Sequence, residues 1–181
     1  TREETLQERR KLGRIVMRVA ILSDVHGNLE ALESVLIAID RHDVDRIIVL
    51  GDVVGYGPDP VACIYRIREV EGICVLGNHD QALLDPERIH ELNSMARETL
   101  LGSRTMVGEQ ELAYLNSFEF RYTEANAVFT HANPLEPEDW QSLYLFEHVD
   151  WCLSGLAARI AFVGHTHYPG IYCRMDTASV P

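Results

Sequence analysis

Apolar and polar positions follow two different periods along the first half of the chain. Apolar residues form a continuous run of strand length up to Leu22, and then recur from Leu29 to Ile39 at the three- and four-residue spacing of one helix face. The pattern repeats, with Pro60 standing where a helix could begin without losing an intrahelical hydrogen bond. The predicted elements are strands over 15–22, 46–50 and 73–76 and helices over 29–39 and 61–68. Strands that alternate with helices in this way predict parallel βαβ units.

The second half of the chain predicts helices first and a mixed β region afterwards. Residues 86–116 have helical spacing, with Gly102 and Gly108 as breaks. A β-hairpin is predicted from strands over 118–122 and 127–130, followed by a helix over 144–159 and a strand over 160–163. Three aromatic residues near the last helix are expected in the core rather than in a pocket wall: Trp140, Tyr144 and Phe146. The chain lacks internal repeats and linkers, so one α/β domain over 17–181 is predicted.

Five predicted strands end in a small or polar residue and then in a residue type that binds metals. The residues concerned are Asp24 and His26, Asp52, Asn78 and His79, His131, and His165 and His167. Functional groups of an open α/β sheet gather beyond the carboxyl ends of its strands, so these side chains are expected to meet at one site. Glycine and proline near both two-residue pairs place the ligands where the strand gives way to a loop.

This set of side chains is too large for one tetrahedral zinc ion. Leaving His79 aside, it contains two carboxylates, four imidazoles and one amide. About four ligands complete a zinc site, whereas seven suit two metal ions that share a carboxylate. Nitrogen and oxygen ligands without a thiolate favour manganese, iron or zinc, and manganese is our first expectation.

The composition of the chain argues against some classes of binding partner. The chain has 181 residues with 16 basic and 28 acidic side chains, a formal net charge of −12. A surface that tracks nucleic-acid phosphates needs clustered Lys and Arg, so a nucleic-acid partner is not expected. No uncharged apolar run reaches membrane-spanning length, and the four cysteines lack close pairing, which predicts reduced thiols in a cytoplasmic protein. The charged segment 1–16 is interpreted as an upstream extension or an expression remnant, with a short surface helix as the alternative.

The order of the motifs resembles the calcineurin-like metallophosphoesterase superfamily, in particular its small prokaryotic phosphoesterases. The blocks are Asp24-x-His26, Gly51-Asp52-Val53-Val54-Gly55, Gly77-Asn78-His79-Asp80, His131, and Gly164-His165-Thr166-His167. The resemblance implies a four-layer α/β sandwich with mostly parallel central strands and flanking helices. Only 14 residues follow His167, so a C-terminal truncation with an incomplete second sheet is expected.

The resemblance also implies roles for these residues. One metal ion would be held by Asp24, His26 and His167, the other by Asn78, His131 and His165, and Asp52 would bridge them. A hydroxide between two dications would attack phosphorus, and His79 would act as general acid or as a hydrogen-bond donor in the transition state. Asp80 is expected to cap a helix, with a role in anchoring the site as the alternative.

One departure from the family pattern bears on the substrate. The serine/threonine phosphatases and the symmetrical dinucleoside tetraphosphatases of the superfamily have Asp-Arg in the second block, where this chain has Gly55-Tyr56. Tyrosine cannot form the bidentate contact that a guanidinium makes with phosphate, which disfavours a dedicated phosphoprotein phosphatase.

The leading hypothesis is therefore a phosphoesterase with two metal ions that hydrolyses small phosphodiesters or phosphomonoesters. The alternatives are an asymmetrical dinucleoside polyphosphate hydrolase and a non-catalytic scaffold of the same fold. The presence of His79 disfavours the scaffold. The sequence predicts no oligomeric state.

Overall fold

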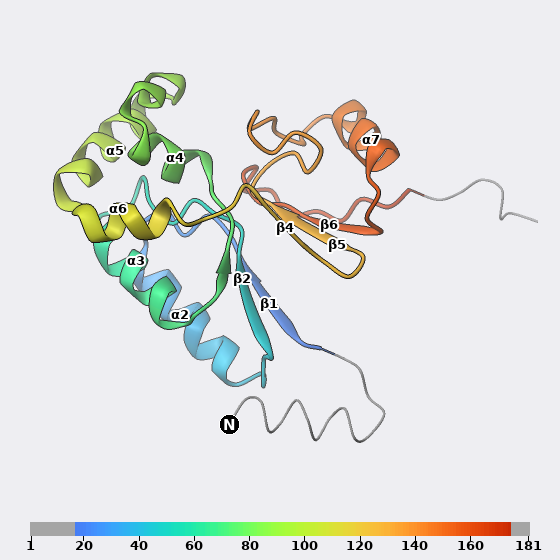
Figure 1. Cartoon of the computed structure of the whole chain (residues 1–181), viewed down its shortest axis with the longest axis horizontal. Helices are drawn as coiled ribbons and strands as arrows, with labels where there is room; N and C mark the ends of the chain where they lie inside the picture. Colours follow the sequence, from blue (N-terminus) through green and yellow to red (C-terminus); the bar gives the residue numbers. More distant parts are fainter. Residues whose placement is uncertain (1–16, 175–181) are drawn as a thin grey trace, which may run out of the picture.

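The computed structural model describes residues 17–174. Its first half is a parallel three-stranded sheet in the order β1-β2-β3, as the alternating pattern predicted. The elements are β1 Val19–Leu22, α2 Leu29–Asp40, β2 Arg46–Val49, α3 Pro60–Glu69 and β3 Ile73–Cys74. Both helices lie along the same face of this sheet (Figure 1). Residues 15–16 of the predicted first strand, and the segment 1–16 as a whole, lie outside the described residues.

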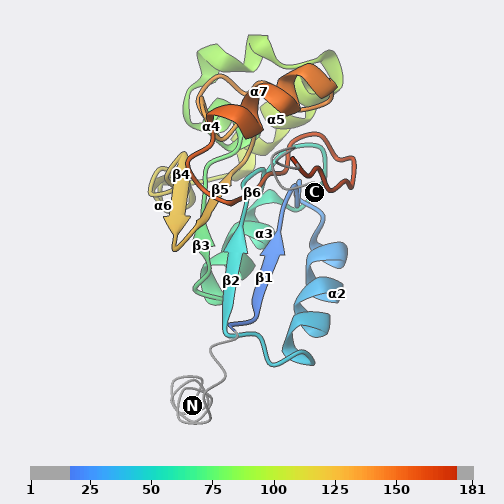
Figure 2. The same ribbon diagram turned by 90° about the vertical axis from the view of Figure 1, so that its right-hand side faces the viewer.

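A second three-stranded sheet is formed by the later part of the chain. It consists of β4 Arg121–Glu124, β5 Ala127–Thr130 and β6 Ile160–Phe162, with β4 antiparallel and β6 parallel to the central β5. The predicted hairpin is confirmed, but its first strand lies two to three residues later than expected and its loop is only Ala125-Asn126. Helix α7, Phe146–Gly155, lies beside this sheet (Figure 2) and is shorter than the predicted 144–159.

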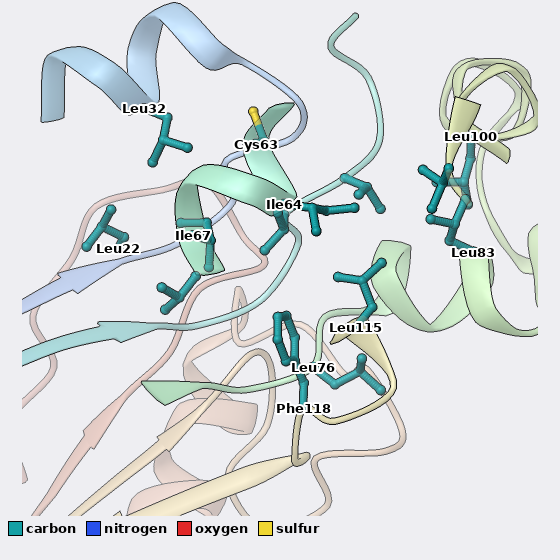
Figure 3. Close-up of a cluster of buried hydrophobic side chains, with 14 of the residues drawn as sticks. Leu22, Leu32, Cys63, Ile64, Ile67, Leu76, Leu83, Leu100, Leu115 and Phe118 are labelled. Atoms are coloured by element: carbon teal, nitrogen blue, oxygen red, sulfur yellow. The ribbon is translucent and has the colours of Figure 1, made fainter. Parts of the chain in front are cut away.

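Alternation along β2 explains how the layers pack. Ile47 and Val49 belong to a large core shared with the helices, whereas Ile48 and Leu50 point the other way and pack with Phe129 of the second sheet. The order of layers is therefore helices, first sheet, second sheet and α7. The larger core is drawn in Figure 3, where Leu32 of α2 and Ile67 of α3 face the strands. The expected four-layer α/β fold is confirmed.

The middle of the chain is helical, as predicted, and forms several short helices. They are α4 Asn78–Leu84, a 3₁₀ helix η1 Pro86–Glu91, α5 Ser94–Met106 and α6 Glu109–Leu115. The predicted break at Gly108 is confirmed, because this residue is the N-cap of α6, but the predicted break at Gly102 is wrong, because α5 continues through it. Helix α4, the helix that the expected cap at Asp80 implies, begins at a candidate ligand, Asn78. None of the described helices combines the length and apolarity needed to cross a bilayer.

Candidate functional site

The seven predicted ligands and His79 lie together where the strands of both sheets end. Asp24 and His26 follow β1, Asp52 follows β2, and Asn78 opens the helix after β3. From the second sheet, His131 follows β5 directly, and His165 and His167 follow β6. The two sheets thus bring their carboxyl ends to one place, with ligand-type side chains contributed by both.

One group of side chains consists of Asp24, His26 and His167. The Nε2 atom of His167 lies 3.1 Å from Oδ1 of Asp24 and 3.1 Å from Nε2 of His26. All three ligand atoms lie within 4.8 Å of one another. Two imidazole nitrogens and a carboxylate oxygen that converge in this way suit one shared cation, because ligands about 2.1 Å from an ion are about 3 Å apart.

A second group consists of Asp52, His131 and His165, with Asn78 beside it. The Nε2 atom of His131 lies 3.2 Å from Oδ2 of Asp52 and 3.1 Å from Oδ1 of Asn78. The same Oδ2 of Asp52 is 3.6 Å from Nε2 of His26. Asp52 therefore lies between the two groups, because the same carboxylate oxygen is near a histidine of each; Oδ1 of Asp24 lies farther, 4.0 Å, from Nε2 of His131.

Backbone carbonyl groups orient two of the imidazoles. Nδ1 of His26 lies 3.0 Å from the carbonyl oxygen of Val54, and Nδ1 of His131 lies 2.6 Å from that of Leu50. When Nδ1 donates to a carbonyl, Nε2 is left without a proton and can bind a metal, so the rings of His26 and His131 are held in the tautomer that a metal site requires.

Five of the seven candidate ligands have a backbone conformation that is rare for their residue types. The residues with φ between +49° and +65° are Asp24, His26, Asp52, His165 and His167. A positive φ costs free energy in any residue with a Cβ, and such residues cluster at functional sites. No residue pattern indicated this feature, because Asp and His, like other residues with a Cβ, usually have a negative φ.

Charge and burial have opposite effects on the pKa values of Asp52 and His131. Burial raises the pKa of Asp52, but the positive charge of His131 and its hydrogen bond outweigh burial and hold this pKa below its usual range. Burial lowers the pKa of His131, but the charge of Asp52 and the hydrogen bond between them raise it to about 9. In the absence of metal ions, an imidazolium thus compensates a carboxylate that is only 2% exposed.

His79 borders the cluster without belonging to either of these two groups. Its backbone N–H donates to Oδ1 of Asp52 at 2.9 Å, and its ring is packed edge-on against His26. Its Nδ1 atom is buried and has no hydrogen-bond partner among residues 17–174. Burial lowers the pKa of His79 to about 4, so this imidazole is neutral at pH 7.

Asp80 joins the loop after β2 to the start of α4. One carboxylate oxygen accepts hydrogen bonds from the backbone N–H groups of Val53 (2.9 Å) and Val54 (3.2 Å), and the other accepts from that of Gly77 at 3.1 Å. The bond to Gly77 is the helix cap that the sequence indicated. The two other bonds anchor the segment that carries Asp52, so Asp80 combines both of the roles considered for it.

Two cavities open beside the ligands, and their walls contain residues that the sequence did not assign to the site. A cavity of about 310 Å³ borders Gln81 and Trp140, and one of about 340 Å³ borders Tyr56 and Tyr144. The expectation that Trp140, Tyr144 and Phe146 belong to the core is wrong. Tyr144 and Phe146 are 55% and 76% exposed, and Trp140 is half-buried in a cavity wall.

The family of the chain follows from comparison with known proteins. A model of the calcineurin-like phosphoesterase superfamily domain matches residues 17–180. An uncharacterized protein from Methanocaldococcus jannaschii is 36% identical over 156 residues, which is 83% of this chain and 63% of that protein. A symmetrical bis(5'-nucleosyl)-tetraphosphatase from Pseudomonas syringae pv. tomato is 40% identical over 80 residues, 42% of this chain and 26% of that enzyme.

Solved structures agree with this assignment. The crystal structure of a metallophosphoesterase from Sphaerobacter thermophilus is 37% identical and has a TM-score of 0.72, over 84% of this chain and 61% of that one. A hypothetical protein from Pyrococcus horikoshii OT3, 20% identical, has the same fold with a TM-score of 0.73 over 85% and 71% of the two chains. The chain spans less than two thirds of the length of the M. jannaschii and S. thermophilus proteins. It belongs to the calcineurin-like phosphoesterase superfamily.

Proposed function

We propose that the protein is a phosphoesterase that uses two divalent metal ions to hydrolyse small phosphodiesters or phosphomonoesters. The observation that carries the proposal is the position of Asp52 between two groups of ligand atoms, Asp24, His26 and His167 on one side and His131 and His165 on the other. Two carboxylates and four imidazoles this close together must share protons when no cation lies among them. Their convergence supports a pair of cations rather than a structural hydrogen-bond network.

The donor set fits two hard to intermediate metal ions. Asp24, His26 and His167 would hold one ion, Asn78, His131 and His165 the other, and Asp52 would contact both. When bound, two dications neutralise the phosphate oxygens and activate water as a nucleophile. Imidazole and oxygen ligands without thiolate favour manganese, iron or zinc, and manganese remains the first choice.

The chain itself contributes the orientation of these ligands. The carbonyls of Val54 and Leu50 fix the rings of His26 and His131, and Asp80 holds the backbone that follows Asp52 and the backbone of Gly77 in place. The backbone N–H groups of His79 and His165 donate to Asp52 and Asp24 respectively. Hydrogen bonds to ligating carboxylates fix their orientation, so the reacting geometry is set before substrate arrives.

His79 is suited to act as a neutral hydrogen-bond donor rather than as a positively charged imidazolium. Its Nδ1 has neither an exposed surface nor a partner, so the ring edge that borders the larger cavity is the one with Nε2. A proton on Nδ1 would be buried without an acceptor, which favours the tautomer with the proton on Nε2. Because the ring is neutral at pH 7, we propose that this N–H stabilises the charge that develops on the leaving oxygen.

Hydrolysis of bis(p-nitrophenyl) phosphate by the manganese-loaded protein tests this proposal. Turnover should depend on added metal, and His79→Ala should lower kcat by about 100-fold or more while leaving metal content unchanged. His90→Ala is the matched control, because His90 is exposed on η1 and borders neither cavity. A metal-loaded protein without turnover of mono- or diesters would contradict the proposal and favour the scaffold.

A second candidate is the asymmetrical hydrolysis of a dinucleoside polyphosphate. It is favoured by the 80-residue similarity to an enzyme named as a tetraphosphatase, although that name specifies symmetrical cleavage. Product analysis with diadenosine tetraphosphate distinguishes the modes, because asymmetrical cleavage gives ATP and AMP, whereas symmetrical cleavage gives two ADP. Absence of ATP and AMP, with turnover of simple diesters, would exclude this candidate.

A further inference from the structure

The two cavities meet at the ligand cluster and form the two arms of one cleft. Both are bordered by Asn78 and His165, and both share Glu91 and Leu92 as a wall. We call the cavity of about 310 Å³ the Trp140 arm; it is completed by Gln81, Arg88, Asp139 and Trp140. The other cavity contains the side chains of Tyr56 and Tyr144. A phosphodiester has two organic groups on phosphorus, and two cavities beside the same ligands offer each group a place.

The indole of Trp140 is held in position without a ligand. Its Nε1–H donates to Oε1 of Gln81 on α4 at 3.0 Å, and its ring lies edge-on to His131 at a centroid distance of 5.9 Å. Phe120 packs against it at 5.8 Å. The backbone of Trp140 has a φ of +53°, a conformation that costs free energy in a residue with a Cβ. The indole of Trp140 therefore lines this arm and is held from several sides.

Polar groups with a defined direction accompany this surface. The indole N–H can only donate, so the oxygen of Gln81 must face it and the amide NH₂ group points elsewhere. Within the described chain, that NH₂ group has no acceptor among the hydrogen bonds formed. Asp139 adds a carboxylate acceptor, while the single cation, Arg88, is already paired with Glu91 at 3.3 Å and with Asp85 at 3.7 Å.

We propose that the Trp140 arm is a subsite for a planar nitrogen heterocycle, such as a nucleobase, carried by one ester group of the substrate. Stacking on the indole uses the flat face of the heterocycle, and Gln81 and Asp139 offer a donor and an acceptor to its edge. The arm has about the smallest volume of a small-molecule pocket, enough for one such group. This inference depends on the proposed function in one respect, because the proposed function places the phosphorus atom at the ligand cluster.

Two substrates with the same leaving group isolate the contribution of the heterocycle. Thymidine 5'-(p-nitrophenyl phosphate) and methyl p-nitrophenyl phosphate both release p-nitrophenol, but only the first carries a base. Trp140→Ala should lower the ratio of kcat/KM for the thymidine diester to kcat/KM for the methyl diester by at least about fivefold, because stacking of one base contributes about 1–3 kcal/mol. A loss that affects both substrates equally leaves this ratio unchanged. Trp140→Phe should keep more of the ratio, and Gln81→Leu should lower it.

Phe146→Ala is the matched control, since this aromatic side chain is 76% exposed and borders neither arm. It should leave both the ratio and the rates unchanged. An unchanged ratio in Trp140→Ala and Gln81→Leu, with both variants folded and loaded with metal, would overturn the subsite.

Binding of adenosine tests the subsite without turnover. The chain has two tryptophans, and the other, Trp151, borders neither arm, so the two indole N–H signals in an NMR spectrum provide a probe and an internal reference. Adenosine should shift the signal of Trp140 and leave that of Trp151 in place. If this shift occurs but no phosphate ester is hydrolysed, the proposed function fails and the subsite stands. Hydrolysis of the methyl diester without any shift and with an unchanged ratio would reject the subsite alone.

Discussion

The Nδ1 atom of His79 lies against Gly55, so close that a Cβ on residue 55 would be 2.3 Å from it. Gly55 also has a φ of +94°, a conformation that residues with a Cβ rarely adopt. Glycine at this position thus allows the loop after β2 to pass beside the imidazole. Among residues 17–174 no side chain hydrogen-bonds Nδ1 of His79, so packing against the loop after β2 holds this edge of the ring.

Gly55→Ala is predicted to lower both stability and turnover. The positive φ and the contact with His79 should reduce the free energy of unfolding by about 1–3 kcal/mol. Because the ring must move to admit a methyl group, kcat should fall more than metal content does. Urea denaturation, metal analysis and the diesterase assay measure the three quantities. An unchanged kcat would show that His79 does not need its present position.

Gly102→Ala is the opposite case within the same chain. Gly102 lies inside α5, and a Cβ there would have nothing within 4 Å. Alanine restricts the unfolded chain and favours a helix more than glycine, so the free energy of unfolding should increase by about 0.5–1 kcal/mol. Turnover should not change, because this glycine is far from the ligands in sequence and borders neither cavity. A decrease in stability would contradict the structure, in which a methyl group at residue 102 contacts nothing.

Asp80→Asn is predicted to destabilise the protein although the two side chains have the same shape. Both oxygens of Asp80 accept backbone N–H groups, and an amide would place an NH₂ group against one of them. This carboxylate is fully buried, so the expected loss is about 2–3 kcal/mol in the free energy of unfolding.

Asp85→Asn is the matched control for that substitution. Asp85 is exposed and caps η1 by accepting from the backbone N–H of Glu87, which asparagine also does well. Its effect should stay within about 0.5 kcal/mol. Equal effects of the two substitutions in thermal or urea denaturation would contradict the anchoring role of Asp80.

The parts of the fold that the sequence predicted are those in which local pattern and tertiary packing agree. Helix α2 shows this agreement, because Leu32 and Leu36 recur at helical spacing and are the residues buried in it. The break expected at Gly102 was wrong, since glycine lowers helix stability by only about 1 kcal/mol and the burial of Leu100 in the core outweighs that cost.

The candidate ligands were accessible from sequence because each follows an apolar strand, whereas the cleft walls were not. Trp140 and Tyr144 lie in a segment outside the helices and strands, where no periodic pattern marks a buried face. An aromatic residue there looks the same in the sequence whether it fills the core or borders a cavity. Only the fold brings Trp140 to Gln81, a residue 59 positions away. No residue pattern indicates that Asp24 and His167 adopt a positive φ.

Metal binding should stabilise the protein through Asp52. A cation that binds only the folded state at 100 times its Kd raises the free energy of unfolding by about 2.7 kcal/mol, and EDTA should reverse the increase. The increase with manganese should be smaller at pH 6 than at pH 8, because the imidazole ligands must be neutral to bind a metal. Asp52→Asn should remove most of it, while Asp150→Asn, an exposed change on α7, should remove none. Thermal denaturation with and without manganese measures the difference, and equal stabilisation of both variants would place the metal away from Asp52.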